Sequence, residues 1–253
     1  MPDAGSTEER LDVTKRIYES YVSSGASKLH PEMIRDLAPR MPYLTHIIRT
    51  HFPADRHSSI LDIGCGYGAL LHAARQEGYR NCRGIDASVE QVKTAHDLGI
   101  ADVSQVDMTS FLQEQPSDSF DVVIAFDVVE HLTKKEVCWL IDQVHRILKR
   151  NGRWIIHVPN AESPFFGRIR YGDFTHELAF TCGSLTALLK SSHFNNVQCF
   201  EDTPIVHGVK SLLRFVLWKA LRMMMKCYLL AEKGEAEACI FTQNLLAVAS
   251  PVK

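Results

Sequence analysis

The chain has 253 residues, of which 45% are hydrophobic and 23% charged, and its formal net charge at pH 7 is −2. This length and composition predict one globular α/β domain with a buried core and accessory helices. The nearly balanced charge provides no general attraction to nucleic acid, so a nucleic-acid partner is not expected. No apolar run approaches the roughly 20 residues that a membrane-spanning helix needs.

The seven cysteines are scattered along the chain without a C-x-x-C pair. Their odd number and irregular spacing predict reduced thiols, as in a cytoplasmic protein, rather than a disulfide framework. Residues 1–10 are polar and predict a loose tail rather than a secretion signal.

Residues 1–55 are predicted to form this tail and a set of helices. Apolar residues recur at helical spacing over residues 11–22. A second helix begins at Pro31 or Glu32 and ends before Pro39, and a third spans residues 43–52. The remainder, residues 56–253, is predicted to be the ligand-binding domain.

A glycine-rich turn is the first feature with a chemical meaning. Residues 60–63 predict a short buried strand and residues 69–76 a helix, with Gly64, Gly66 and Gly68 in the turn between them. Glycine can adopt positive φ, and without a Cβ it lets a ligand approach the backbone N–H groups near the start of a helix. The turn is therefore predicted to bind a ligand.

Two cofactors are compatible with this turn. Gly64, Gly66 and Ala69 satisfy the dinucleotide fingerprint G-x-G-x-x-A, and Asp86 follows Gly66 by 86 − 66 = 20 residues, where an acid that binds ribose is expected. Asp62 would repel a pyrophosphate, whereas it would suit the ammonium and sulfonium of S-adenosylmethionine.

Further strands are predicted at residues 81–86, 103–106 and 119–126, and Ser88 is a good N-cap for a helix that runs to residue 98. The third of these strands is almost continuously apolar, which is typical of a sheet centre buried on both faces. Since ligands bind at the carboxyl edge of such sheets, polar residues at these strand ends are candidates for the site. They are Asp86, Asp107, Asp127, Glu130 and His131.

The turn, read as L-D-I-G-C-G-Y-G, resembles motif I of the class I S-adenosylmethionine-dependent methyltransferases, and the Glu-His-Leu at residues 130–132 resembles their fourth motif. Later motifs follow in the family's order through residue 249. The resemblance implies a doubly wound, seven-stranded, Rossmann-like sheet with an antiparallel last strand. It also implies that the helices of residues 1–55 cover the cofactor.

The resemblance further implies S-adenosyl-L-methionine as the cofactor. In the family an acid at the position of Asp86 binds the ribose hydroxyls, an acid at that of Asp107 receives the adenine amino group, and the side chain of Met108 packs near the ring. The predicted cofactor-binding residues are Asp62, Gly64, Cys65, Gly66, Gly68, Asp86, Ala87, Asp107, Met108, Phe126 and Asp127.

A helix is expected at residues 134–149, with Asn151 and Gly152 as its stop, followed by a strand at 153–158. The polar segment 159–181 is long for a loop after a strand and predicts a substrate loop. Its Arg168, Arg170 and Tyr171 could hold a phosphate or a sugar.

His176 of this loop lies between Asp173 and Glu177, and it is the predicted general base, with an acid orienting its ring. His131 is the first alternative and His157 the second. No local spacing forms a metal-binding signature, so no metal site is assigned. A divalent metal stays open, since Asp127, His131, His157 and His176 could converge in the fold.

The last strand is expected at residues 238–249, after a helix at 181–193 and a strand at 197–201. The segment between, about 205–234, predicts a helical insert of one or two helices. Over residues 206–232 it is basic and amphipathic. Its cations are Lys210, Arg214, Lys219, Arg222 and Lys226. Packing on the domain, a homodimer contact and peripheral membrane association all remain open.

Residues 172–181 (G-D-F-T-H-E-L-A-F-T) and 243–247 (Q-N-L-L-A) look like bacterial methyltransferases of polysaccharide and O-antigen biosynthesis. This resemblance implies O-methylation of a sugar hydroxyl on a glycan or glycolipid precursor. The alternatives are a quinone, phenol or lipid-like O-methyltransferase, an NAD-dependent sugar enzyme, and a non-catalytic module that binds S-adenosylmethionine.

Overall fold

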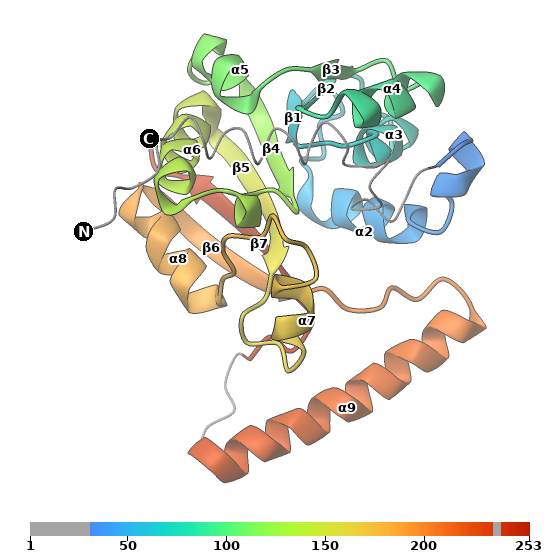
Figure 1. The fold of residues 1–253 in the computed structure, drawn as a ribbon, viewed down its shortest axis with the longest axis vertical. Coiled ribbons are helices and arrows are strands. Elements are labelled where there is room, and N and C mark those ends of the chain that lie inside the picture. Colours follow the sequence, from blue (N-terminus) through green and yellow to red (C-terminus); the bar gives the residue numbers. More distant parts are fainter. Residues whose placement is uncertain (1–30, 235–238) are drawn as a thin grey trace.

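The computed structural model describes residues 31–234 and 239–253, so the helix predicted at 11–22 lies outside the described residues. One seven-stranded sheet has the order β3-β2-β1-β4-β5-β7-β6, with helices packed around it (Figure 1). β7 runs antiparallel to both of its neighbours, and the other adjacent pairs are parallel. The predicted fold class, including the antiparallel last strand, is confirmed.

The strands are β1 (Ile60–Ile63), β2 (Cys82–Asp86), β3 (Val103–Gln105), β4 (Phe120–Phe126), β5 (Leu148–Pro159), β6 (Phe194–Glu201) and β7 (Asn244–Pro251). The α-helices are α2 (Met41–His51), α3 (Ala69–Gln76), α4 (Val89–Asp97), α5 (Met108–Glu114), α6 (Lys134–Ile147), α7 (Phe166–Arg170), α8 (Cys182–Ser191) and α9 (Val209–Lys233). Two short 3-10 turns are η1 (Ile34–Leu37) and η2 (Val129–His131).

The sheet is buried on both faces. In β4, Val122 and Ile124 pack into a core with α2, α3 and α4, whereas Val123 and Ala125 pack into a second core with α5, α6 and α8. All four side chains are fully buried. The nearly continuous apolar run thus has the central place that its composition predicted.

Several predicted boundaries are wrong. α6 ends at Ile147 and β5 begins at Leu148, so Asn151 and Gly152 lie inside β5 rather than in a helix stop. Phe120 pairs with Leu148 ahead of an irregularity in the β4–β5 register, and this pairing extends β5 toward its start. The insert forms one helix, α9, of 25 residues.

The expectation of reduced cysteines is also wrong for one pair. Cys182 at the start of α8 and Cys199 in β6 form a disulfide, with Cα atoms 5.9 Å apart. The two residues are 17 positions apart in sequence, and only the packing of α8 along β6 brings them together.

Asn160 fixes the start of the predicted substrate loop. Its side chain is fully buried, and Nδ2 donates to the carbonyl oxygens of Ile240 (2.7 Å) and Thr242 (2.9 Å). Oδ1 accepts from the N–H of Glu162 at 3.0 Å. The amide therefore joins the end of β5 to the segment that precedes β7.

We expect Asn160→Ala to lower the free energy of unfolding by about 2–4 kcal/mol, because two buried carbonyl groups lose their donor. For a domain of this size this corresponds to a melting temperature lower by roughly 4–16 °C. Thermal denaturation measures it, with Asn151→Ala at an exposed position of β5 as the control. Equal melting temperatures for the two variants would contradict the assignment.

Candidate active site

The turn after β1 has the backbone that a ligand seat requires. Gly64 and Gly66 have φ of 65° and 54°, a region that other residues rarely adopt. A Cβ on Gly64 would lie 2.4 Å from Cγ2 of Val128. Only glycine at this position lets the turn lie directly against the segment that follows β4.

Asp86 at the end of β2 holds this turn in place. Its Oδ2 accepts from the N–H of Gly66 and its Oδ1 from the N–H of Ser88, both at 2.8 Å. Each carboxylate oxygen retains a second lone pair for another donor. Burial raises the pKa of Asp86, while these two hydrogen bonds oppose the rise.

A cavity of about 560 Å³ extends from the glycine turn to the loop after β5. Predicted site residues that line it are Asp62, Gly64, Cys65, Gly66, Phe126, Asp127, His131, Asp173 and His176. Predicted cofactor residues outside its wall are Gly68, Asp86, Ala87, Asp107 and Met108. Asp107 caps α5, with Oδ1 accepting from the N–H of Ser110 at 3.0 Å, and its predicted contact with adenine stays a prediction.

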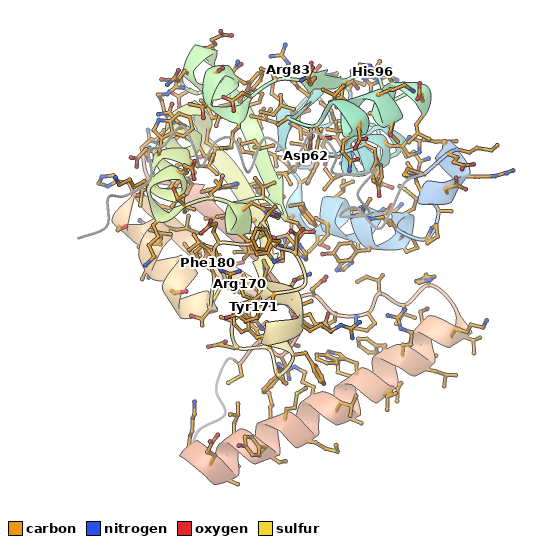
Figure 2. The ribbon with its side chains drawn as sticks, viewed as in Figure 1. Asp62, Arg83, His96, Arg170, Tyr171 and Phe180 are labelled. Atoms are coloured by element: carbon orange, nitrogen blue, oxygen red, sulfur yellow. A yellow bond between two sulfur atoms is a disulfide. The ribbon has the colours of Figure 1, made fainter. Side chains whose placement is uncertain are left out.

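Asp62, labelled in Figure 2, is a buried acid of β1, two residues before Gly64. It is 2% exposed, and its Oδ1 has no hydrogen-bond partner among the described residues. Burial, and next the charge of Asp86, raise the pKa of Asp62 to about 8. A buried carboxyl without a partner, on the wall of a cavity, is suited to a cationic ligand group.

The sequence analysis missed Arg40 and Tyr67, both of which line the cavity. Nη1 of Arg40 donates to the hydroxyl of Tyr67 at 2.6 Å. The pair joins the start of α2 to the glycine turn across 27 residues of sequence. Tyr67 lies inside the glycine motif, but nothing in the sequence pairs it with Arg40.

His131 of η2 and His176 of the loop face each other, with ring centroids 4.8 Å apart. Nδ1 of His176 lies 3.0 Å from the carbonyl oxygen of Ile169. A carbonyl can only accept, so Nδ1 carries the proton and Nε2 of His176 is left as the basic nitrogen.

A chain of hydrogen bonds fixes the other ring. The hydroxyl of Thr175 donates to Oδ1 of Asp173 at 2.6 Å, so its oxygen accepts from Nδ1 of His131 at 2.7 Å. Burial lowers the pKa of His131, and His176 lowers it further. Burial alone would raise the pKa of Asp173, but the bonds from Thr175 hold it below its usual value. Asp173, predicted as a catalytic residue, thus orients His131 through Thr175.

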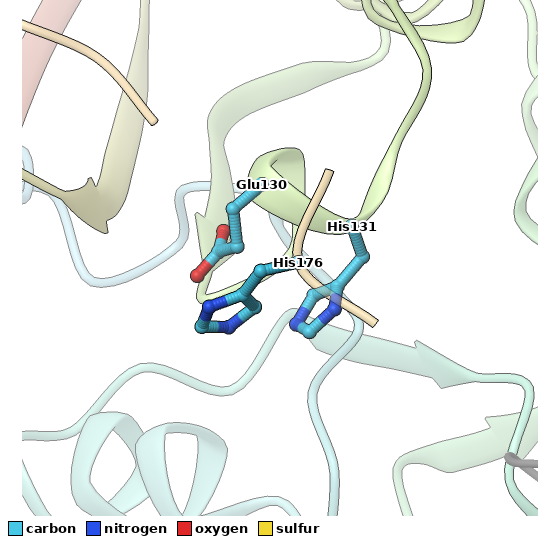
Figure 3. Close-up of side chains that lie close together, drawn as sticks. All are labelled: Glu130, His131 and His176. Atoms are coloured by element: carbon cyan, nitrogen blue, oxygen red, sulfur yellow. The ribbon is translucent and has the colours of Figure 1, made fainter. Parts of the chain in front are cut away.

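Glu130 completes this group, as Figure 3 shows. Its side chain is 1% exposed and Oε2 has no partner among the described residues. Burial, and next the charge of Asp127, raise the pKa of Glu130 well above its usual value. One ligand atom from each of Glu130, His131 and His176 lies within 4.8 Å of the others, so the three could hold a metal ion.

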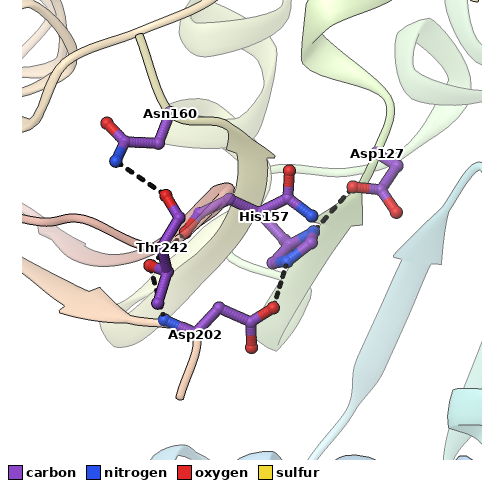
Figure 4. A network of polar contacts seen from close by, with 6 residues as sticks. Asp127, His157, Asn160, Asp202 and Thr242 are labelled. Atoms are coloured by element: carbon purple, nitrogen blue, oxygen red, sulfur yellow. Dashed lines mark hydrogen bonds and ion pairs between the residues drawn. The ribbon is translucent and has the colours of Figure 1, made fainter. Parts of the chain in front are cut away.

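His157 is excluded as a general base by its partners (Figure 4). Nδ1 lies 2.6 Å from Oδ1 of Asp127 and Nε2 3.5 Å from Oδ2 of Asp202. Burial alone would lower the pKa of His157, but Asp127 and Asp202 raise it to about 10. The ring is therefore a cation at neutral pH and stacks on Phe126.

The arginines of the loop have different roles. Arg170, labelled in Figure 2, donates from Nη1 to the carbonyl oxygen of His176 and from Nη2 to that of Glu177 at 2.9 Å. Its guanidinium therefore braces the loop, whereas Arg168 lines the cavity.

The model of the methyltransferase domain family matches residues 33–199. The chain belongs to this family. It is 34% identical over 90 residues to norajmaline N-methyltransferase of Rauvolfia serpentina, covering 33% of this chain and 30% of that protein. It is 31% identical over 123 residues to the ubiquinone biosynthesis O-methyltransferase of Rickettsia felis, covering 48% and 49%. These matches span less than half of each relative.

A solved structure supports the fold. The chain is similar to a SAM-dependent methyltransferase from Archaeoglobus fulgidus, with a TM-score of 0.62, 20% identity, and coverage of 83% of this chain and 94% of that chain.

S-adenosylmethionine is the cofactor, and the residues present fit it. The partnerless oxygen of Asp62 and the Cβ-free turn at Gly64 and Gly66 would receive its amino-acid end, and the lone pairs of Asp86 would receive the ribose hydroxyls. The cofactor supplies an electrophilic methyl group when bound.

We expect the buried carboxyl of Asp62 to destabilise the cofactor-free protein at high pH. Its pKa rises from 3.8 to about 8 on folding, so stability falls as pH rises through this window and levels off above it. Asp62→Asn should therefore melt roughly 5 °C or more above wild type at pH 8, with no gap near pH 4. Differential scanning calorimetry measures it, with the exposed Asp142→Asn as the control.

The same Asp62→Asn variant should bind S-adenosylmethionine at least roughly tenfold more weakly at pH 8, because a charged hydrogen bond is lost. Wild-type affinity in a folded variant would contradict the role of Asp62.

Asp86→Ala should weaken cofactor binding by roughly 1.5–3 kcal/mol, the range for a hydrogen bond to a charged group. Titration calorimetry with S-adenosylmethionine measures it, and circular dichroism shows whether the turn has lost its fold. An unaltered affinity in a folded variant would leave no role for Asp86 at the ribose.

Proposed function

We propose that the protein transfers a methyl group from S-adenosylmethionine to a sugar hydroxyl of a glycan or glycolipid precursor. The observation that carries the proposal is the placement of two basic Nε2 atoms, from His131 and His176, in the same cavity as the glycine turn. A hydroxyl acceptor must lose a proton during methylation, whereas the sulfur of the cofactor cannot take it.

His176 is the proposed general base. When bound, S-adenosylmethionine would supply the methyl group to the acceptor oxygen, and its sulfur would keep the electron pair of the broken carbon–sulfur bond. The hydroxyl proton passes to Nε2 of His176, whose Nδ1–H is held by the carbonyl oxygen of Ile169. Nε2 of His131, whose ring is oriented by Thr175 and Asp173, accepts a hydrogen bond from a neighbouring hydroxyl of the sugar and so positions the acceptor beside His176.

The polar side of the cavity supports a hydroxylated acceptor. Arg168, Asp173 and Asn244 line it together with the two histidines, and such groups suit sugar hydroxyls or a phosphate on the acceptor. The ubiquinone relative is named as an O-methyltransferase and the norajmaline relative as an N-methyltransferase. The assay therefore compares glycan acceptors with phenolic and amine acceptors.

We expect His176→Ala to lower kcat by roughly 10²- to 10⁴-fold, because the general base is lost, with cofactor affinity within a few-fold of wild type. The assay follows labelled methyl groups by mass spectrometry on glycan, phenolic and amine acceptors.

Three controls separate the proposed base role of His176 from the positioning role of His131 and from metal binding. His131→Ala should raise KM for the acceptor as well as lower kcat, and His176→Asn should be as slow as His176→Ala. Chelation of divalent metals should leave turnover unchanged; activity that is lost on chelation and restored by a metal would make Glu130, His131 and His176 ligands instead. Methylation of amines alone, or no turnover with any acceptor while the cofactor binds, would overturn the proposed function.

A further inference from the structure

α9 lies along the outside of the domain, between β6 and β7 in sequence (Figure 1). One side of the helix attaches it to the domain. Ser211 on this side is buried and Trp218 half-buried, and Nε of Arg222 pairs with Oε2 of Glu201 in β6 at 2.6 Å. At roughly 100° per residue these three positions lie within a narrow arc of the helix.

The opposite side of α9 is apolar along its whole length. We call this face the outer stripe, and it spans an arc of about 140°. Its large members have exposed fractions from 48% to 76%. They are Val209, Leu212, Leu213, Val216, Leu217, Met223, Met224 and Leu230. A contiguous apolar face of this kind that turns away from the domain marks a surface for a partner.

Cations border the outer stripe on both edges. Lys210 and Arg214 lie along one edge, and Lys219 and Lys226 along the other. The first acidic residue of the helix is Glu232. An apolar face between two rows of cations is the arrangement of a helix that lies in the surface of an anionic membrane.

A second copy of the chain fits this surface less well. Two outer stripes packed together would bring a cationic edge of one helix beside a cationic edge of the other in either direction, because both edges are cationic. Anionic phospholipid headgroups would instead neutralise both edges at once.

We propose that α9 docks the protein on an anionic phospholipid bilayer, with the outer stripe in the interface and the edge lysines among the headgroups. Among residues 31–234 and 239–253 no helix is long and apolar enough to cross a membrane, so the helix lies flat. Docking needs neither cofactor nor acceptor and is therefore measured without turnover.

The test is sedimentation of the full chain with phosphatidylcholine vesicles, with and without phosphatidylglycerol. Wild type should bind the anionic vesicles, and added salt should weaken the binding. Lys219→Glu with Lys226→Glu should partition at least ~30-fold more weakly, because each lost cation costs about fivefold and the added carboxylates are repelled as well. Lys134→Glu with Lys135→Glu, at exposed positions that start α6, makes the same change in net charge and should bind as wild type does.

Leu217→Ser with Met224→Ser removes apolar area without changing charge, and it should also weaken binding. These positions are exposed, and an unchanged melting temperature confirms that each variant folds. The proposal is overturned if wild type ignores anionic vesicles, or if both lysine pairs have equal effects. It is also overturned if light scattering finds a dimer that Leu217→Ser with Met224→Ser dissociates while vesicle binding is unaffected.

Discussion

The structure depends on the close approach of the turn after β1 to the segment after β4. A Cβ on Gly64 would lie 2.4 Å from Val128, so glycine is what allows the two strand ends to meet. Asp127 takes the left-handed conformation, with φ of 54°, immediately before this contact. The chain then turns into η2, which carries Glu130 and His131 over the cavity. The glycine turn and the polar part of the cavity wall formed by Glu130 and His131 thus depend on the same contact.

The buried acids at this edge of the sheet differ in whether they have a charged partner. Asp127 is paired with the imidazolium of His157, and its pKa is held below the usual value despite burial. Asp62 and Glu130 are buried with an oxygen that has no partner among the described residues. A buried carboxyl without a partner costs stability. Both acids line the cavity, where an ammonium or a hydroxyl of a ligand can form the missing hydrogen bond and offset this loss of stability.

Local patterns predicted much of this arrangement. The apolar run of β4 and the glycines after β1 are read directly from composition and spacing, because burial on two faces and positive φ each restrict the residue type. Long-range contacts were not predictable. Asp173 lies three residues before His176 in sequence, yet its link through Thr175 leads to His131. The sequence could not show which face of α9 points outward, because apolar residues occur on both of its sides. The burial of Ser211 and Trp218 and the contact of Arg222 with Glu201 show which side is attached.

Hydrogen bonds join the predicted substrate loop to the segment that follows β4. The N–H groups of Glu177 and Leu178 both donate to the carbonyl oxygen of Glu130, at 2.7 and 2.9 Å, while Arg170 holds the carbonyl groups of His176 and Glu177. His176 is therefore tied to the same short segment that carries His131 and touches the glycine turn. A movement of the turn would therefore reach both imidazoles through these hydrogen bonds. The proposed base is in this way linked by hydrogen bonds to the segment that lies against the glycine turn.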